Sequence, residues 1–368
     1  NSRDVVDHPN MTVVLRGTVT NLHMSDNGQR VEAATVRDRD GNEARIEAGA
    51  FVLAAGGLEN PRLMLASRDR DPNGIGNAHG NVGRFFMEHP RARAGIIRTK
   101  NPVRLLRASY RMEAINGVRT VSLLRPTDEM QSEARTLNHG VTVIAVKPPG
   151  SPNNLTIRVY DGLRHGQQPS RLNRVLWRAM KNTGLWLNRQ AEPYISAALV
   201  KAGLRDLNLV IRAEQAPNPD SRITLSEETD ALGMPRIRLD WQFLDIDKDS
   251  ISVIVDRFDA FLKAQGLGHV QKADWLDDPS KPWEIDPLIG FHPIGGYHHM
   301  GTTRMASSPE TGVVDENCKV FGTDNLYAAG CSIFPTGGWG NPTLTIVALA
   351  HRLADHLANR LMPSHQGG

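Results

Sequence analysis

Two polar side chains that lie far apart along the chain have the types best suited to chemistry. His298 sits in the Gly/Thr-rich stretch 297–304, YHHMGTTR, and Asn341 stands at the head of an apolar segment. An imidazole takes up a proton near neutral pH, whereas a carboxamide hydrogen-bonds an oxygen without accepting its proton. The pair therefore suits the loss of a hydroxyl proton from an alcohol while a hydride leaves the same carbon, provided that the fold brings the two together.

Several further blocks accompany these residues in a fixed order. They are FVLAAGGLENPR (51–62), GNVGR (80–84) leading to HP (89–90), EQAPNPDSR (214–222), the histidine stretch, GVVD (312–315) and NLYAAG (325–330). In these blocks the sequence resembles the glucose-methanol-choline (GMC) flavoprotein oxidoreductases. The His298/Asn341 pair and the ending NPTLTIVALAHRLADHL (341–357) are most similar to the pyranose oxidase and sugar dehydrogenase branch of that family.

This resemblance implies a cofactor, a reaction and roles for individual residues. The cofactor is FAD, and the reaction is oxidation of a CH–OH group of a sugar, glycoside or polyol by proton abstraction and hydride transfer to flavin N5. His298 is implied as the base, and Asn341 holds the position where some members have His. The residues implied to lie against the flavin are Val19, Gly56, Gly57, Ala329, Gly330, Cys331, Pro342 and Thr343. Gly330 departs from the many relatives with Asp there, which puts a side-chain contact from this turn in doubt.

Neighbouring histidines compete with His298 for the role of base. Successive residues of an extended loop point to opposite sides, so only one of His298 and His299 faces a common ligand. The motif match selects His298, keeps His299 as a substrate-contact candidate and leaves His292 a distant third. No metal site is expected, because the histidines lack paired ligand spacing and Cys318 and Cys331 are distant in sequence.

A second set of substrate-contact candidates lies in the middle of the chain. Glu214 and Gln215 sit in the block that is shared with sugar-oxidising relatives. Polar residues at a strand end are also common turn formers. Both interpretations stay open for these two residues.

The usual dinucleotide fingerprint, Gly-x-Gly-x-x-Gly between a strand and a helix, does not occur in the sequence. The nearest Gly-rich loop, 74–80, lacks a preceding apolar strand and is expected to be a surface turn. Family members carry the fingerprint upstream of the block that resembles residues 11–60 here. The chain is therefore expected to be the C-terminal portion of such an enzyme, partnered by a complementary N-terminal chain that arises by cleavage or from a split gene.

The pattern along the chain predicts an α/β (α+β) protein with part of a Rossmann-like FAD-binding domain and an antiparallel-sheet substrate domain. The FAD-binding parts are placed at 1–89 and 286–368, and the substrate domain at 90–285. Predicted strands are 11–24, 31–36, 44–46, 51–55, 91–98, 118–124, 140–146, 155–159, 207–214, 237–241 and 325–329, and predicted helices begin at Pro61, Asp245 and Thr343. Residues 171–203 carry a basic amphipathic pattern, typical of a surface helix and also compatible with a membrane or subunit contact.

Composition narrows the classes of partner. A formal charge of +3 without a long basic run argues against nucleic acid, and no apolar run is long enough to span a membrane, so a soluble protein is expected. With only Cys318 and Cys331 the cellular compartment stays open, the cytoplasm being favoured over the periplasm or the outside of the cell. The electron acceptor, oxygen or another carrier, stays open, as does a homo-oligomer of the assembled unit. Two alternatives also stay open: a flavin-containing hydroxynitrile lyase and a non-catalytic subunit of a flavoprotein complex.

Overall fold

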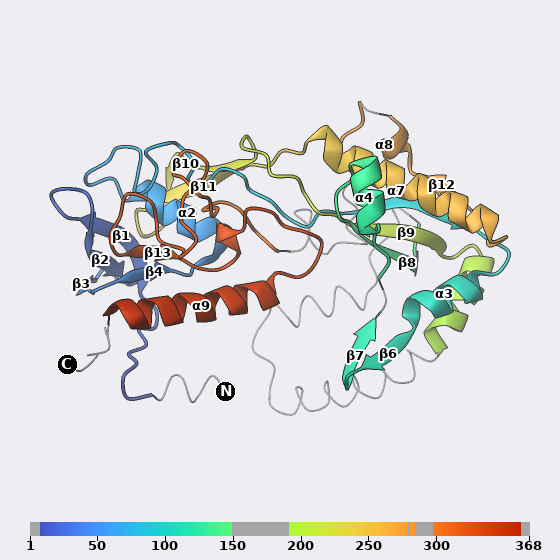
Figure 1. Ribbon diagram of the computed structural model, residues 1–368, viewed down its shortest axis with the longest axis horizontal. Coiled ribbons are helices and arrows are strands. Elements are labelled where there is room, and N and C mark those ends of the chain that lie inside the picture. Colours follow the sequence, from blue (N-terminus) through green and yellow to red (C-terminus); the bar gives the residue numbers. More distant parts are fainter. Residues whose placement is uncertain (1–7, 122, 149–190, 279, 285–296, 362–368) are drawn as a thin grey trace. The chain divides into compact units, whose positions relative to one another are not determined.

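The computed structural model describes residues 8–121, 123–148, 191–278, 280–284 and 297–361 (Figure 1). Its contacts divide the chain into two compact units, which are described separately. Unit 1 comprises residues 1–88, 215–244 and 298–368, and unit 2 comprises residues 89–214 and 245–297. Residues 215–244 were predicted to lie within the middle domain, whereas the contacts group them with unit 1. The assignment of FAD and substrate binding to these units stays a prediction.

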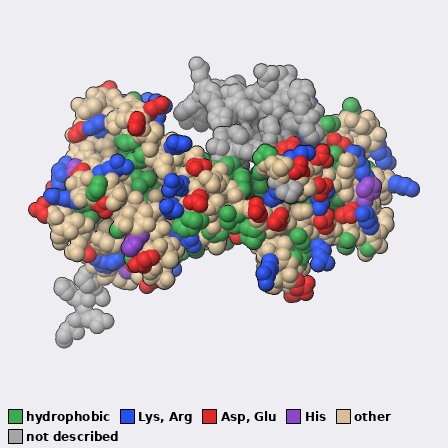
Figure 2. All heavy atoms as spheres, turned by 90° about the horizontal axis from the view of Figure 1, so that it is seen from above, with side chains coloured by type: hydrophobic (Ala, Val, Ile, Leu, Met, Phe, Trp, Pro, Cys, Tyr) green, Lys and Arg blue, Asp and Glu red, His purple; other side chains and the backbone are tan. Residues whose placement is uncertain are grey.

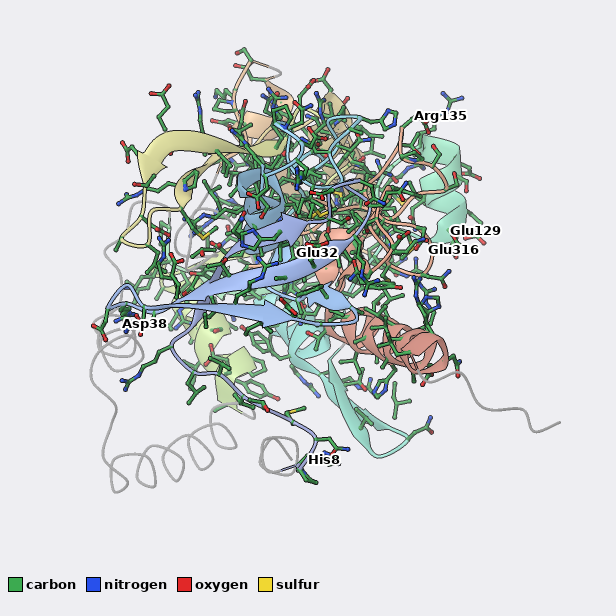
Figure 3. All side chains as sticks on the ribbon, turned by 90° about the vertical axis from the view of Figure 1, so that its left-hand side faces the viewer. His8, Glu32, Asp38, Glu129, Arg135 and Glu316 are labelled. Carbon is green, nitrogen blue, oxygen red and sulfur yellow. The ribbon has the colours of Figure 1, made fainter. Side chains whose placement is uncertain are left out.

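Unit 1 begins with a three-stranded antiparallel meander of β1 (Thr18–Met24), β2 (Val31–Arg37) and β3 (Glu43–Glu47), as the β-branched alternation predicted. Its buried face carries Leu22 and Val31, which join the core of the unit. Figure 3 looks onto this sheet, with Glu32 on β2 and Asp38 just past its end. Residues 11–17 were predicted to belong to the first strand but form none, and Leu15 is exposed.

A second sheet of unit 1 is a parallel pair, β4 (Phe51–Leu53) and β13 (Leu326–Ala328), joined in the register Phe51–Leu326 to Leu53–Ala328. Helix α2 (Gly56–Ala66) follows β4 directly, and the short 3₁₀ turn η1 (Cys331–Ile333) follows β13. Both strands were predicted. The helix was expected to begin at Pro61 and begins earlier, so the two glycines form its first turn.

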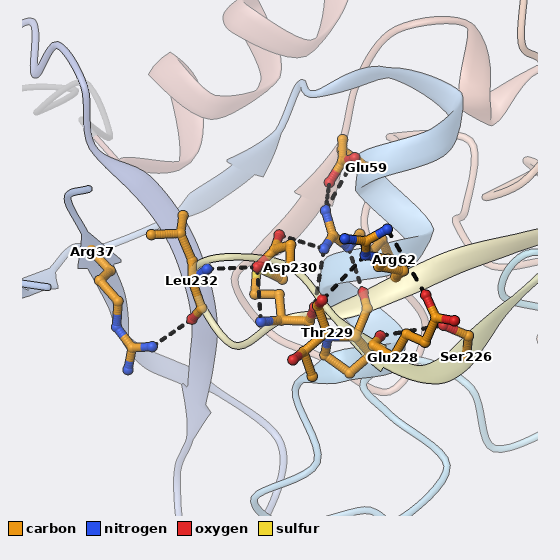
Figure 4. Close-up of polar contacts among 11 residues, drawn as sticks. Arg37, Glu59, Arg62, Ser226, Glu228, Thr229, Asp230 and Leu232 are labelled. Carbon is orange, nitrogen blue, oxygen red and sulfur yellow. Dashed lines mark hydrogen bonds and ion pairs between the residues drawn. The ribbon is translucent and has the colours of Figure 1, made fainter. Parts of the chain in front are cut away.

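Helix α2 is tied to the hairpin of β10 (Arg222–Thr229) and β11 (Pro235–Asp240) by Arg62 (Figure 4). The Arg62 guanidinium donates to Pro235 O at 2.8 Å and to Asp230 Oδ2 at 2.7 Å, and it also lies 3.1 Å from Glu59 Oε2. These bonds explain why the predicted strand 237–241, observed as β11, belongs to unit 1.

The Arg62–Asp230 pair predicts acid-dependent stability. Burial alone would raise the pKa of Asp230, but Arg62 and the N–H groups of Leu232 and Met234 stabilise the carboxylate and hold its pKa below the ordinary value. A depressed pKa contributes stability that is present above the unfolded-state pKa and is lost as the pH falls through the folded-state pKa. We therefore expect Asp230→Asn to lower the melting temperature at pH 7 by an amount equivalent to about 1 kcal/mol, a difference that shrinks as the pH falls toward the lowered folded-state pKa.

Thermal unfolding at pH 7 and at pH 3 tests this expectation. Asp40→Asn is the control, because Asp40 is exposed on a turn of the same unit and makes no ion pair with the described part of the chain. An Asp230→Asn penalty as large at pH 3 as at pH 7 would contradict the ion-pair explanation.

The last helix of unit 1, α9 (Thr343–Leu361), packs along β13. Leu353 is buried in the core, the Arg360 guanidinium donates to Tyr327 Oη at 3.1 Å, and the Tyr327 and His356 rings lie 6.0 Å apart. Its N-terminal turns leave apolar side chains uncovered within the described structure: Leu344 is 81% exposed and Val347 is 47% exposed. The predicted helical segment 343–356 is confirmed and extends to Leu361.

Unit 2 is built on an antiparallel sheet in the order β12-β5-β9-β8. Its strands are β5 (Arg91–Arg98), β8 (Gly140–Val146), β9 (Asp206–Arg212) and β12 (His269–Lys272), and helices α3 (Pro102–Tyr110) and α7 (Asp245–Ala264) contact it. Alternate residues such as Ala92, Val141 and Leu209 pack with Ile251 and Leu106 in one core, so α3 and α7 cover the same face. The predicted antiparallel sheet is confirmed, while the predicted strand 155–159 lies outside the described residues.

Smaller elements complete unit 2. They are the hairpin of β6 (Met112–Ile115) and β7 (Val118–Val121), and helices α4 (Asp128–Ala134) and α8 (Asp274–Asp277). The predicted strand 118–124 is thus shorter than expected. Most of the basic segment 171–203 lies outside the described residues, and its end, 191–201, is helical.

Acidic and basic side chains are interspersed on the face shown in Figure 2. No helix among the described segments is long and apolar enough to cross a bilayer.

Candidate active site

The site is organised around the histidine loop, defined as residues 298–305. Met300 exchanges two backbone hydrogen bonds with Met87, at 2.9 and 3.0 Å. Further along, the N–H groups of Thr303 and Met305 donate to Ser332 O and Ile333 O at 2.9 and 2.8 Å. The loop is therefore hydrogen-bonded through its main chain to the segment before Glu88 on one side and to η1 on the other. These bonds hold the conformation of its Gly/Thr-rich sequence.

Two glycines let the main chains approach the loop closely. A Cβ on Gly57 would lie 2.1 Å from His299 O, and a Cβ on Gly301 would lie 2.1 Å from Phe85 O. Gly301 also has a φ of +85°, which side chains rarely adopt. The position of the two histidines is thus set by main-chain packing against α2 and the 85–87 segment.

The hydroxyl of Thr302 replaces a hydrogen bond that helix α2 cannot make. Pro61 lies inside α2 and has no N–H, so the Gly57 carbonyl four residues earlier lacks its helical donor. Thr302 Oγ1 donates to that carbonyl at 2.7 Å. The proline of one motif and the threonine of another are therefore two parts of a single contact.

Asn60 joins the carboxyl ends of the parallel strands. Its Oδ1 accepts from Ala55 N at 2.8 Å, and its Nδ2 donates to Ser332 Oγ at 2.9 Å and to Ala329 O at 3.2 Å. Ser332 in turn accepts from Thr303 Oγ1 at 2.8 Å. This buried network brings the end of β4, the turn after β13 and the histidine loop to one place.

The two histidines differ in their surroundings. The backbone N–H of His298 donates to Glu88 Oε1 at 2.6 Å, and His298 is half-buried. The ring of His299 packs on the Phe86 ring at 5.7 Å, and its Nε2 lies 3.4 Å from the same Glu88 oxygen. The His299 carbonyl accepts from Cys331 Sγ at 3.2 Å. Burial raises the pKa of the Cys331 thiol, which keeps it protonated and able to donate.

Around this loop lie most of the residues predicted to contact a cofactor. Ala329 N donates to Leu53 O at 2.8 Å, which sets the turn 329–331 beside the start of α2. Gly56 and Gly330 both have positive φ, and a Cβ on either would meet no atom within 4 Å. The structure thus brings Gly56, Gly57, Ala329, Gly330 and Cys331 together with the histidine loop.

The other predicted contacts with the cofactor or the reacting alcohol lie on β1 and around the start of α9. Val19 lies on β1 and is 38% exposed. Asn341 is exposed, Pro342 is buried and Thr343 begins α9, all in the same unit as His298. The pairing of His298 with Asn341 stays a prediction.

Glu214 and Gln215, the predicted substrate contacts, form hydrogen bonds with other residues of the protein. Glu214, in unit 2, accepts from Asn138 N at 2.9 Å, and its own N–H donates to Nδ1 of His139, whose pKa burial lowers to about 3. The Gln215 amide, in unit 1, accepts from Trp241 Nε1 at 2.9 Å and donates to Gln242 O at 2.9 Å. Substrate contacts from Glu214 and Gln215 stay predictions.

Three residues of the site were not singled out from the sequence: Glu88, Asn60 and Ser332. For Glu88 a signal existed, because a carboxylate directly after the apolar run Phe85-Phe86-Met87 is unusual unless it has buried partners. Among the described residues, no group of three His, Cys, Asp or Glu side chains is arranged to hold a metal ion.

The local structure fits a flavin nucleotide. Ligands of α/β proteins bind beyond the carboxyl ends of parallel strands, where Gly56 and Gly330 leave open space. Helix α2 begins at Gly56, and its N-cap residue Ala55 provides no side-chain cap, so the N–H groups of the first turn can bind an anionic group such as a phosphate.

Comparisons with known proteins agree with this geometry. Residues 217–350 match the family model described as GMC oxidoreductase. The chain is 26% identical over 345 residues to 2-methyl-1,2-propanediol dehydrogenase of Mycolicibacterium austroafricanum, covering 93% of this chain and 53% of that protein. It is also 26% identical over 342 residues to the fructose dehydrogenase large subunit of Gluconobacter japonicus, covering 92% and 52%.

Among solved structures, pyridoxine 4-oxidase from Mesorbium loti has a TM-score of 0.53 at 18% identity, covering 96% of this chain and 59% of that one, which supports the fold alone. The chain spans about half the length of the curated relatives it matches. The family match over residues 217–350 and these relatives make the chain similar to the GMC oxidoreductases, whose flavoproteins bind FAD.

Proposed function

We propose that this chain supplies the catalytic part of an FAD-dependent oxidoreductase that oxidises a CH–OH group of a sugar, glycoside or polyol. The observation that carries the proposal is the position of the histidine loop. Its main chain is hydrogen-bonded to η1, beside Gly56 and Gly330, which leave open space at the carboxyl ends of β4 and β13. A proton acceptor in a fixed loop beside open space at the strand ends is suited to alcohol oxidation. When bound, the flavin supplies the hydride acceptor.

The residues of the chain divide the remaining work. His298 accepts the hydroxyl proton as the carbinol hydride departs, because imidazole is basic enough at neutral pH and its loop is held by main-chain bonds. Asn341 hydrogen-bonds the substrate oxygen and cannot take the proton, so the base is His298 alone. Pro342 and Thr343 present the N-terminal end of α9, whose partial positive charge favours the negative charge that accumulates on reduction.

The relatives support the proposed substrate class. Two relatives of similar identity are named for a diol and for fructose, both of which carry hydroxyl groups on adjacent carbons. For this chain the proposed donor is accordingly a sugar or a related polyol, in keeping with the pyranose oxidase and sugar dehydrogenase branch.

A complementary segment is proposed to hold the ADP half of FAD. Parallel sheets are normally covered on both faces, yet Val52 in β4 is 42% exposed and the apolar start of α9 is uncovered in the described structure. Further parallel strands, carrying the dinucleotide fingerprint and belonging to the same or a separate polypeptide, would cover these surfaces. The relatives are about twice as long as the part that this chain matches.

Anaerobic spectroscopy tests the proposal. The protein, purified with any subunit that accompanies it, should be yellow, and its flavin absorbance should bleach on addition of D-fructose, D-glucose, a methyl glucoside or 1,2-propanediol. A colourless preparation that contains every subunit would eliminate the oxidoreductase. A yellow preparation that no alcohol bleaches but that cleaves a cyanohydrin would establish a lyase in its place.

A further inference from the structure

The carboxylate of Glu88 is fully buried in unit 1. Its side chain is 0% exposed, and it follows Phe86 and Met87, which are also fully buried. Removing a carboxylate from water costs several kcal/mol unless charged or hydrogen-bonding partners replace the water. The partners of Glu88 therefore indicate what the residue does.

Both histidines of the loop converge on one oxygen of this carboxylate. The backbone N–H of His298 donates to Oε1 at 2.6 Å, a short bond of the charge-assisted kind. The Nε2 of His299 lies 3.4 Å from the same atom, within ion-pair range when the imidazole is protonated. One buried oxygen thus contacts the main chain of the first histidine and the side chain of the second.

The backbone around Glu88 is itself held by hydrogen bonds to the 215–242 segment. Its N–H donates to Gln215 Oε1 at 3.1 Å, and that amide is fixed by Trp241 and by Gln242 O. Two residues before Glu88, Phe86 and Ser221 exchange two hydrogen bonds of 2.7 Å. The carboxylate is therefore pre-positioned by the 215–242 segment before it meets the loop.

The His299 side chain is directed toward Phe86 and Glu88. Its ring lies on Phe86, which is buried, and its Nε2 faces Glu88. Because neighbouring residues of an extended segment point to opposite sides, holding His299 on Glu88 turns His298 the other way. The His299–Glu88 contact accordingly determines which of the two imidazoles is available to act as a base.

We propose that Glu88 is a positioning residue of the histidine loop: its carboxylate anchors the His298 backbone and sequesters His299, so that His298 alone is presented as the base. This inference rests on the proposed function for its catalytic meaning. Glu88 touches neither substrate nor cofactor in this role. Its negative charge also favours the protonated form of the neighbouring base, so it stabilises the imidazolium that forms as the alcohol loses its proton.

Two substitutions separate the charge from the hydrogen bond. Glu88→Gln keeps an acceptor for His298 N but removes the charge, and we expect the midpoint of the rising limb of flavin reduction against pH to fall by about one unit, since the base binds its proton less tightly. Glu88→Ala removes both, and we expect a further loss of about 10²-fold in kcat with little change in KM. An unshifted midpoint in Glu88→Gln overturns the electrostatic part of the role.

A second measurement needs no turnover. Diethyl pyrocarbonate modifies accessible neutral imidazoles, and fragment-ion mapping of the cofactor-loaded protein distinguishes His298 from His299. His298 should react several times faster than His299 in the wild type, and Glu88→Ala or Glu88→Gln should raise the rate at His299 several-fold. Equal rates in the wild type, or an unchanged His299 rate in both variants, overturn the inference.

The two measurements keep the proposals separable. If no alcohol bleaches the wild-type flavin, the proposed function fails, while the modification rates still decide the role of Glu88. Asn325→Ala is the matched control, because Asn325 is a buried polar residue of unit 1 whose amide binds Val31 instead of the loop. It should lower the melting temperature and leave both the pH midpoint and the histidine reactivities unchanged.

Discussion

Replacing His298 by Ala is expected to leave FAD bound and to lower the rate of flavin reduction by about 10² to 10⁴, the range usually lost with a general base. The residue holds its loop through its backbone N–H, which the substitution retains, so the fold and the cofactor site should persist. Stopped-flow reduction under anaerobic conditions measures the chemical step directly, and the visible spectrum reports the FAD content of the same sample.

His299→Ala is the natural companion to this variant. Because His299 packs on Phe86 and faces Glu88, its loss should slow reduction far less than the loss of His298. An unaltered rate in His298→Ala together with a large loss in His299→Ala would move the base to His299 and refute the assignment made above.

Replacing Gly57 by Ala is expected to lower the reduction rate by about 10²-fold, although residue 57 carries no reactive group. The added methyl would lie 2.1 Å from His299 O, a main-chain atom that cannot rotate away and that also accepts from Cys331 Sγ. Either the histidine loop or α2 must shift by roughly 1 Å, and a displacement of that size near a reacting centre can cost about 10²-fold. The same stopped-flow assay, with FAD content determined separately, measures the effect.

Gly49→Ala controls for the methyl group itself. At Gly49 a Cβ meets only Leu361 Cδ2 at 3.5 Å, an ordinary contact, and the backbone conformation suits other residues. This variant should reduce its flavin at the wild-type rate. A Gly57→Ala enzyme that is equally fast would show that the close approach does not set the position of the loop.

Periodicity predicted the regular elements well, because it is a local property. Strands β5 and β8 occupy the predicted residues, and α7 and α9 begin at the predicted positions. The start of α2 was wrong for a non-local reason. Gly56, Gly57 and Pro61 are helix-breaking signals, but Thr302 and the Asn60 side chain supply the bonds that the helix itself lacks. No local pattern contains that compensation.

The site was predicted only in part for the same reason. Motif spacing identified the histidine loop and the glycines, which the structure brings together. The inclusion of 215–244 in unit 1 depends on Arg62 meeting Asp230, and the role of Glu88 depends on His298 N and Gln215. Each of these contacts joins residues that are remote in sequence, so composition and spacing carry no record of it.

The bond from the Thr302 hydroxyl to the Gly57 carbonyl has an evolutionary consequence. Moving the loop would strand a buried carbonyl that α2 cannot satisfy, at a cost of about 1–3 kcal/mol. Homologues that inherit this proline and threonine are thus constrained to keep the histidine loop where it is. Differences in what they bind should arise in other parts of the site.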